Sequence, residues 1–523
     1  MSDTAATATA AALPTIARRD FPGWLPAMMV KELRQGMRTR GFVGAFIGCQ
    51  VAMALLMSSF AAAASSPNVY VRQSAFSALD GLFWTLLTVL LLLVTPGRAL
   101  GALQLEVTTR TIDLLLLTRL NAWRIVVAKW GSLVLQAVLL LVAVLPYGIV
   151  RYFAGSVDLG RDAWQCLMLL GGCALLTAAG LWGAGLGKVF RFVGVGVIIA
   201  LSSLGRTAIA GISGTGALAA AIPITGIVLL CYNAALLLLF FLVAAVRNIA
   251  PPAENHSLLA RSLPLLALAP VVFAPVVLPF AGSPAVVGIF AAQLLFAALF
   301  LSLVCFGELS NVQQPMAVHV RAASKLTALS RVLLRMTLPG WPSALLYALL
   351  SSLLWAACAV TFALVAASSS PTVVNGMVYA GPLRLGESQL VTWPWLAVLA
   401  LEALAYPAVV ISFMRKPPRQ LGGFYFVMIG GAGTLLGMSY ALSVAYPRFA
   451  LLPDLVSVLP VASLIVNIIP GYNLGNPLAY AVQGIFAISL LGLAWVRARP
   501  YWERLEDIVI RIRNEPDEST PTS

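Results

Sequence analysis

The chain has 523 residues, of which 60% are hydrophobic and 10% are charged. Soluble globular domains carry about a quarter charged residues, so this chain has too few to solvate a soluble surface of its size. The composition excludes a soluble globular protein and predicts an all-α polytopic membrane protein. The net charge of +14 does not point to nucleic acid, because an excess of Lys and Arg in a membrane protein typically belongs to cytoplasmic loops.

Apolar segments that approach the ~20 residues needed to cross a bilayer recur along the chain. They predict about 12 transmembrane helices, at 42–64, 81–95, 131–150, 163–186, 192–203, 226–246, 263–281, 284–305, 342–366, 393–413, 424–445 and 477–496. With the N-terminus inside the cell, 27 of the 33 Lys and Arg fall in cytoplasmic segments. The positive-inside rule therefore places both termini, residues 1–41 and 497–523, on the cytoplasmic side of a cell (inner) membrane.

Residues 451–470 are also apolar and would make a thirteenth span. Pro453, Pro460 and Pro470 interrupt this stretch, which favours a re-entrant or interfacial outer element. The Gly-rich stretch 206–223 occupies the equivalent place before the sixth span. The two halves, 42–250 and 251–496, then form a weak internal repeat of two six-span modules, of the kind that transporters use.

Residues 25–40 predict an amphipathic helix at the headgroup level. Its apolar positions recur at four-residue steps, at Leu25, Met29, Leu33 and Met37, and its charged residues include Lys31, Glu32, Arg34 and Arg38. Cations on such a helix face anionic lipid. It is either a simple anchor before the first span or a working part of the protein.

The cytoplasmic stretch 97–129 carries an apolar cluster at Leu114–Leu117 that is too short to cross the bilayer. Leu105, Thr109, Ile112 and Leu116 share one helical face, and charges of both signs surround it. A polar loop would not need these leucines. The pattern predicts a docking surface for another protein, and the alternative is a helix that lies on the inner leaflet.

These residues resemble the permease subunit of type-2 ATP-binding-cassette (ABC) exporters. The resemblance rests on Glu106, the run Thr111–Thr118, Lys129, Leu145-Pro146 and the earlier Lys31-Glu32-Leu33, and it covers roughly residues 20–250. Arg110 and Ala128 stand where the family usually has Gly. The resemblance implies that 97–129 is a coupling helix that binds a dimer of separate cytoplasmic ABC ATPase subunits, through Glu106, Thr111, Asp113, Leu114, Leu115, Leu116 and Thr118.

Residues 251–496 match this family less well. We expect a degenerate second six-span module, and a specialised extension of a half-transporter is the alternative. One chain could form the whole translocator, or it could pair with a second permease copy. The substrate is not identified by the sequence, although an apolar path suits a hydrophobic or amphipathic molecule.

The chain contains no phosphate-binding loop, because the nearest approach, residues 182–189, has Trp182 in place of the first Gly and Val189 in place of the hydroxyl. Gly183 and Gly187 are interpreted as sites of close helix packing. ATP would therefore be hydrolysed on a partner, and no catalytic residue, metal or cofactor is expected on this chain.

Two other functions remain possible from the sequence. Glu402 is the one carboxylate clearly at membrane depth, and it is either a substrate-path residue, as in an ion-coupled carrier, or a protonated packing group. A membrane transferase needs clustered catalysts. The two histidines and the scattered outer carboxylates do not form such a cluster in the sequence, and the six cysteines are expected to be small buried hydrophobes.

Overall fold

The computed structural model describes residues 26–65, 67–108, 121–153, 159–184, 224–250, 256–273, 284–309, 336, 338, 340–368, 372–374, 377–379 and 477–514. These residues are helical apart from one two-stranded antiparallel hairpin, β1 (Thr372–Val374) with β2 (Met377–Tyr379). Six of the described helices are long and apolar enough to cross a membrane. The chain is therefore a multi-pass helical membrane protein.

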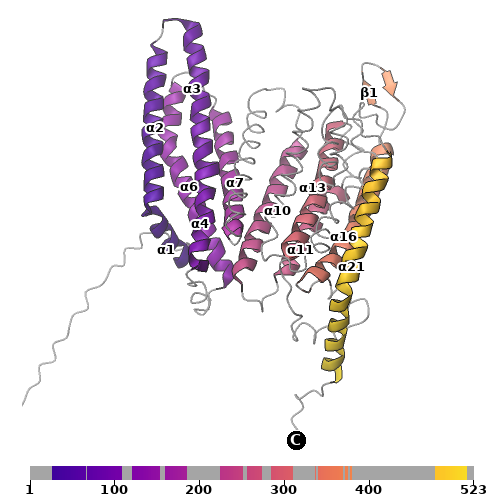
Figure 1. Ribbon diagram of the computed structural model, residues 1–523. Helices are drawn as coiled ribbons and strands as arrows, with labels where there is room; N and C mark the ends of the chain where they lie inside the picture. Colours follow the sequence, from indigo (N-terminus) through magenta and orange to yellow (C-terminus); the bar gives the residue numbers. More distant parts are fainter. Residues whose placement is uncertain are drawn as a thin grey trace, which may run out of the picture.

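The N-terminal helices are a short α1 and a group of long, closely packed helices. Their bounds are α1 Ala27–Met37, α2 Arg40–Ala64, α3 Val69–Val89, the π-helix η1 Leu90–Val94, α4 Thr95–Thr108, α6 Ala122–Phe153 and α7 Leu159–Ala184. Further along lie α10 Ile224–Ile249, α11 Ser257–Val272, α13 Pro284–Leu309, α16 Trp341–Ser368 and α21 Pro477–Asn514. Figure 1 shows the long helices side by side, running broadly in chain order from α2 to α21.

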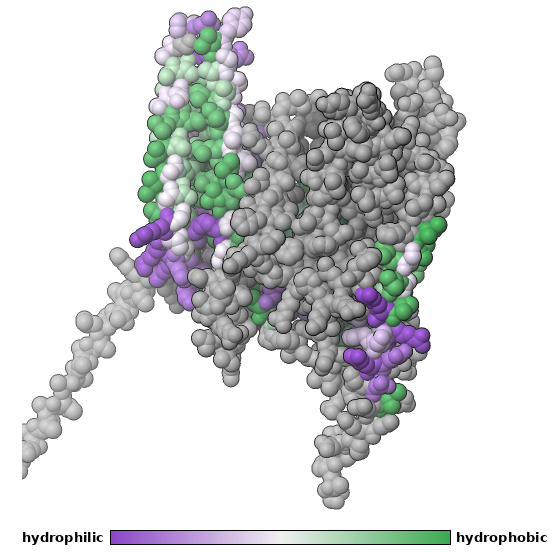
Figure 2. Space-filling view, viewed as in Figure 1, coloured by the Kyte–Doolittle hydropathy of each residue, from purple (hydrophilic) through white to green (hydrophobic). Residues whose placement is uncertain are grey.

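The described helices run in opposite directions between two ends of the bundle. We call the end where α1 lies and α21 finishes the charged end, and the end where α2 joins α3 the opposite end (Figure 1). α2, α6, α11 and α16 run away from the charged end, whereas α3–α4, α7, α10, α13 and α21 run toward it. Figure 2 shows an apolar surface along α2 and α3, between hydrophilic residues at α1 and hydrophilic residues where α2 joins α3. This is the surface expected of helices that face lipid.

Buried apolar side chains form two clusters that meet at α6 and α7. One cluster joins α2, α3, η1, α6 and α7, with Leu87, Leu91 and Cys173 at its centre. The larger cluster continues from α7 through α10 to α11, α13, α16 and α21, and includes Phe240 and Trp355. Packing is continuous across residue 250, and the division into two six-span modules stays a prediction.

Interhelical hydrogen bonds add to this packing in the middle of the bundle. The Gln293 side chain on α13 donates to the Ala267 carbonyl at 2.8 Å and exchanges hydrogen bonds with Asn233 on α10 at 2.7 and 2.9 Å. Trp355 Nε1 donates to the Leu294 carbonyl at 2.9 Å. In lipid a buried amide needs such partners, so α10, α11 and α13 are fixed relative to one another.

Several helix bounds differ from those that hydropathy predicts. The second span, predicted at 81–95, is the middle of a continuous helix that begins at Val69, and the third begins at Ala122 rather than at residue 131. α21 continues past residue 496 to Asn514. Helices do not stop where a bilayer ends, because backbone hydrogen bonds continue into the polar region. The predicted spans 192–203, 393–413 and 424–445 and the outer elements 206–223 and 451–470 lie outside the described residues.

Candidate functional site

The first part of the candidate site is the turn between α1 and α2 at the charged end. The Arg38 and Thr39 backbone N–H groups bond to carbonyls of the last turn of α1, and Thr39 Oγ1 then accepts a hydrogen bond from Phe42 N at 3.3 Å. Thr39 is thus the N-cap of α2, which is a typical role for a threonine. The chain turns at once from α1 into the first span, and α1 is held against the base of the bundle.

Two glycines allow α1 to approach α6 closely. A Cβ on Gly36 would lie 2.2 Å from Gln136 Nε2, and a Cβ on Gly131 would lie 3.0 Å from Met29 Cε. One glycine belongs to each helix, so any larger side chain at either position has to displace its neighbour. Leu33 is the buried apolar residue of α1.

A buried ion pair connects the same two helices. Lys129 Nζ on α6 donates to Glu32 Oε2 on α1 at 3.1 Å, and the two side chains are 4% and 14% exposed. Removing one partner would leave a charge buried without its counterion, which costs far more than the pair itself contributes. The pair therefore fixes the register of α1 on α6.

Arg98 connects α4 to the turn between α1 and α2. Its Nη2 donates to Thr39 Oγ1 at 3.3 Å and to the Gly36 carbonyl at 3.5 Å. Its guanidinium carbon lies 5.3 Å from the centre of the Phe42 ring, within cation–π range. We call the assembly of α1, the start of α2, α4 and residues 122–136 of α6 the N-terminal junction.

The helix that enters the junction contains a π-helical segment. η1 separates α3 from α4, and Thr95 N–H and Oγ1 both bond to the Leu90 carbonyl, the latter at 3.3 Å. Pro96 follows directly and has no N–H to donate, so the ladder is interrupted at this point. Such π segments are common where a helix bends or moves.

Beyond η1, α4 packs tightly on α7. A Cβ on Gly180 would lie 2.8 Å from the Pro96 carbonyl oxygen and 3.0 Å from Ala99 Cβ, and one on Gly183 would lie 2.9 Å from Leu100 Cδ2. The interpretation of Gly183 as a packing glycine is confirmed. Gly187 lies outside the described residues.

The two ends of the predicted coupling helix 97–129 are continuous with neighbouring long helices, and the coupling role stays a prediction. Residues 97–108 continue α3 and η1 as α4, and residues 122–129 are the first two turns of α6. Both ends are joined to membrane helices because their apolar residues pack on α7 and α10. Glu106 lies in α4, and its side chain is not described. The other predicted coupling residues lie outside the described residues, namely Thr111, Asp113, Leu114, Leu115, Leu116 and Thr118.

The interfacial residues fall on or next to α1, as the sequence predicts. Lys31, Arg34 and Arg38 are exposed, and Glu32 is turned toward α6. Sequence reasoning missed Arg98 as the residue that joins this helix to α4, because its partners are 59 and 62 residues away. Glu402 lies outside the described residues.

A second charged cluster, also missed, lies toward the opposite end of the bundle. Arg151 of α6 is 2% exposed and pairs with Asp80 of α3 and, at 3.4 Å, with Asp162 of α7. Its guanidinium carbon lies 4.1 Å from the centre of the Phe83 ring. The pairing of Asp80 with Arg151 could not be predicted from the sequence, since 71 residues separate them.

Within the part of the chain that the structure describes, no group of three or more His, Cys, Asp or Glu could hold a metal ion. All six cysteines are free thiols. Four of them are buried, as predicted, whereas Cys166 is half-buried and Cys231 is exposed on α10.

Comparison with known proteins gives no relative from which a role could be transferred. No protein-family model, no curated protein and no solved structure matches the chain. The functional argument therefore depends on the geometry of the N-terminal junction and on the sequence pattern.

Proposed function

We propose that the chain is the membrane-spanning permease subunit of an ATP-driven exporter of the ABC type. The proposal rests on one observation at the N-terminal junction. The predicted docking segment is connected directly to α4 before it and to α6 after it. Glu32 and Lys129 belong to two separate segments of the family-like pattern, and they lie 3.1 Å apart. A partner protein that binds the segment between α4 and α6 would therefore move two membrane helices directly.

The distribution of charge supports a cytoplasmic position for the junction. The cations with described side chains near the charged end are Lys31, Arg34, Arg38, Arg40, Arg98, Arg124, Lys129, Arg247, Arg261, Arg497, Arg499 and Arg504, and those near the opposite end are Arg72 and Arg151. The positive-inside rule then orients the charged end to the cytoplasm, with both termini on that side of the inner membrane.

The directions of the last described helices support twelve spans rather than thirteen. α16 runs toward the opposite end, and α21 starts there and returns to the charged end (Figure 1). Two crossings between them are consistent with these directions, whereas a third crossing at 451–470 would reverse α21.

In the proposed mechanism, a dimer of cytoplasmic ATPase subunits closes on ATP and pushes residues 106–119. The push reaches α4, which is joined to α1 and α2 through Arg98 and to α7 through Gly180 and Gly183. The π segment at Leu90–Val94 lets α4 tilt relative to α3. A path for a hydrophobic or amphipathic substrate then opens between the spans, and this chain performs no chemistry.

The test is co-purification of a partner ATPase. The full chain, tagged at its C-terminus, is purified from its native membrane, and bound chains are identified by mass spectrometry. A partner with a Gly-x4-Gly-Lys-Ser/Thr loop is expected with the unchanged chain. It should be lost when Leu114, Leu115 and Leu116 are all replaced by Asp, because three carboxylates cannot enter an apolar interface.

The matched control is Ile510→Asp on α21, an exposed apolar residue at the charged end. It makes the same kind of change outside the docking surface and should retain the partner. Undiminished complex formation with the triple variant, or the absence of any such ATPase, would contradict the proposal. Ion-coupled transport through Glu402 would then be the next hypothesis, checked by Glu402→Gln.

A further inference from the structure

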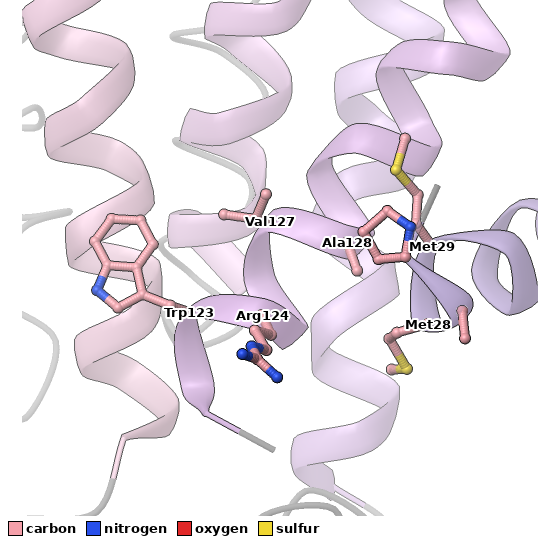
Figure 3. A pocket seen from close by; sticks show the side chains of 8 residues that line it. Met28, Met29, Trp123, Arg124, Val127 and Ala128 are labelled. Carbon is pink, nitrogen blue, oxygen red and sulfur yellow. The ribbon is translucent and has the colours of Figure 1, made fainter. Parts of the chain in front are cut away.

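A pocket lies within the N-terminal junction, between the first turn of α1 and the first two turns of α6. Its volume is about 560 Å³, and it is lined by Pro26, Ala27, Met28, Met29, Trp123, Arg124, Val127 and Ala128. Figure 3 shows these side chains coming from the two helices with an open space between them. None of the lining residues belongs to the proposed docking segment 106–119.

The lining is apolar except for Arg124 at the start of α6. Arg124 lies in the first turn of α6 and is exposed, whereas Val127 and Ala128 lie one turn further toward the middle of the bundle. A molecule that fills the pocket would therefore meet a cation at one end and methyl and thioether groups at the other. A small hydrophilic anion would leave those apolar groups without partners, so the lining favours an amphiphile.

The cations around the pocket favour a negative headgroup. Lys31 and Arg34 follow Ala27 at helical spacings of four and seven residues, so they continue the pocket face of α1, and both are exposed. Within residues 26–38 and 121–130 the one carboxylate is Glu32, and it pairs with Lys129. Among the described residues around the pocket, cations thus outnumber carboxylates.

The surrounding helices lead us to expect the pocket at the level of a bilayer surface. α1 is an amphipathic helix at the charged end, and the exposed apolar residues Val43 and Ile47 begin one to two turns into α2. Trp123 is half-buried in the pocket wall, and Trp is enriched where membrane proteins meet lipid headgroups. A phospholipid in the adjoining leaflet could enter without leaving the membrane.

We propose that this pocket binds one anionic phospholipid from the leaflet at the charged end. Its phosphate lies against Arg124 with Lys31 nearby, and one acyl chain runs along Val127 and Met29. The lipid would fill the gap between the start of α1 and α6 and so hold the junction together. The proposal depends on the pocket and its charges and not on the exporter function.

The test uses the full chain in nanodiscs that contain phosphatidylglycerol and phosphatidylcholine at a ratio of 3:7. Lipid that stays bound after extraction into mild detergent is counted by native mass spectrometry. We expect one retained phosphatidylglycerol. Arg124→Gln should reduce its occupancy about fivefold, which is the effect of one Arg near an anionic surface.

Ala27→Trp tests the pocket itself without a change of charge. Ala27 is exposed on the first turn of α1, so the indole can fill the pocket without disturbing buried packing, and the retained phosphatidylglycerol should again be lost. The matched control, Arg504→Gln, removes an exposed Arg from α21 at the same end and should leave it unchanged.

Three results would overturn the proposal. Equal retention of phosphatidylcholine and phosphatidylglycerol would mean that the site does not select charge. Full retention by both Arg124→Gln and Ala27→Trp would place the lipid elsewhere. Loss of a co-purified protein from Ala27→Trp, with lipid retained, would show that a protein covers the pocket.

Discussion

Arg151 is held between carboxylates from two neighbouring helices. It is 2% exposed, whereas Asp162 is 19% and Asp80 is 40% exposed. Phe83 and Trp84 cover the guanidinium with ring centres at 4.1 and 5.7 Å. A buried guanidinium in a membrane protein needs such partners, because isolated charges at this depth are expensive. The cluster therefore joins α3, α6 and α7 at the end away from the N-terminal junction.

We expect Arg151→Met to destabilise the protein by about 3 kcal/mol, because it leaves two carboxylates without their counterion in a largely buried site. The value lies at the low end for a broken buried pair, since Asp80 remains partly solvated. The measurement is the thermal midpoint of the detergent-solubilised protein, followed by size-exclusion chromatography.

The control for this prediction removes all three charges at once. Asp80→Asn and Asp162→Asn in the Arg151→Met background should restore most of the lost stability, because no uncompensated charge remains. If the triple variant is as unstable as Arg151→Met alone, the guanidinium acts through packing on Phe83 and Trp84 instead.

At the residue scale, sequence analysis identifies charged residues better than it identifies their partners. Lys31, Glu32 and Lys129 can be singled out from the family-like pattern, but their pairing cannot, because Glu32 and Lys129 are 97 residues apart. Arg98 and Arg151 have no local pattern that distinguishes them from other charges at span ends. Their partners are fixed by how the helices pack, and spacing along the chain contains no information on that packing.

At the scale of elements, the contact between α4 and α7 is the most extensive between two helices of the described residues. It depends on a small residue at Gly180, where a Cβ would meet the backbone carbonyl oxygen of Pro96 at 2.8 Å. A carbonyl oxygen of the chain cannot rotate away as a flexible side chain can. The two helices would have to separate to accept any larger residue.

Gly180→Ala should therefore destabilise the protein by roughly 1–3 kcal/mol, as overpacking typically does. Gly171 on the same helix is exposed and has nothing within 4 Å of its Cβ position. Gly171→Ala should be neutral or stabilising by up to about 1 kcal/mol, because alanine favours the helix. Both are compared by thermal midpoint in the same detergent. Equal behaviour of the two variants would show that α4 and α7 do not pack as described.

Hydropathy predicts the existence of helices well and their ends poorly. Nine of the twelve predicted spans fall on described helices. The start of α3 at Val69 cannot be predicted from apolar runs, because Arg72 and Asp80 interrupt the apolar pattern. The structure accommodates Asp80 by pairing it with Arg151. Residues 97–108 also look separate from the second span in the sequence, because the polar Arg98 follows the apolar run. In the structure they continue the same helix as α4.

At the scale of the whole molecule, the distribution of cations and the directions of the helices indicate the same orientation of the bundle. α1 and the end of α21 lie at the same end of the bundle, together with most described cations (Figures 1 and 2). The sequence predicts this arrangement from the positions of Lys and Arg alone, because the positive-inside rule depends on loops and needs no knowledge of packing. The continuous core across residue 250 was not predictable, since two modules and one body give the same hydropathy profile.

The orientation of the bundle gives a direct prediction for single cysteines. Gln73 on α3 and Arg504 on α21 are both exposed, the first near the opposite end and the second at the charged end. A membrane-impermeant maleimide should label Gln73→Cys in intact cells, and Arg504→Cys only after the membrane is permeabilised. The unchanged chain is the control, because it measures the background labelling of the six native cysteines, of which Cys231 is exposed and Cys166 half-buried. Labelling of Arg504→Cys in intact cells would reverse the orientation, and a docking surface on residues 106–119 could then not meet a cytoplasmic ATPase.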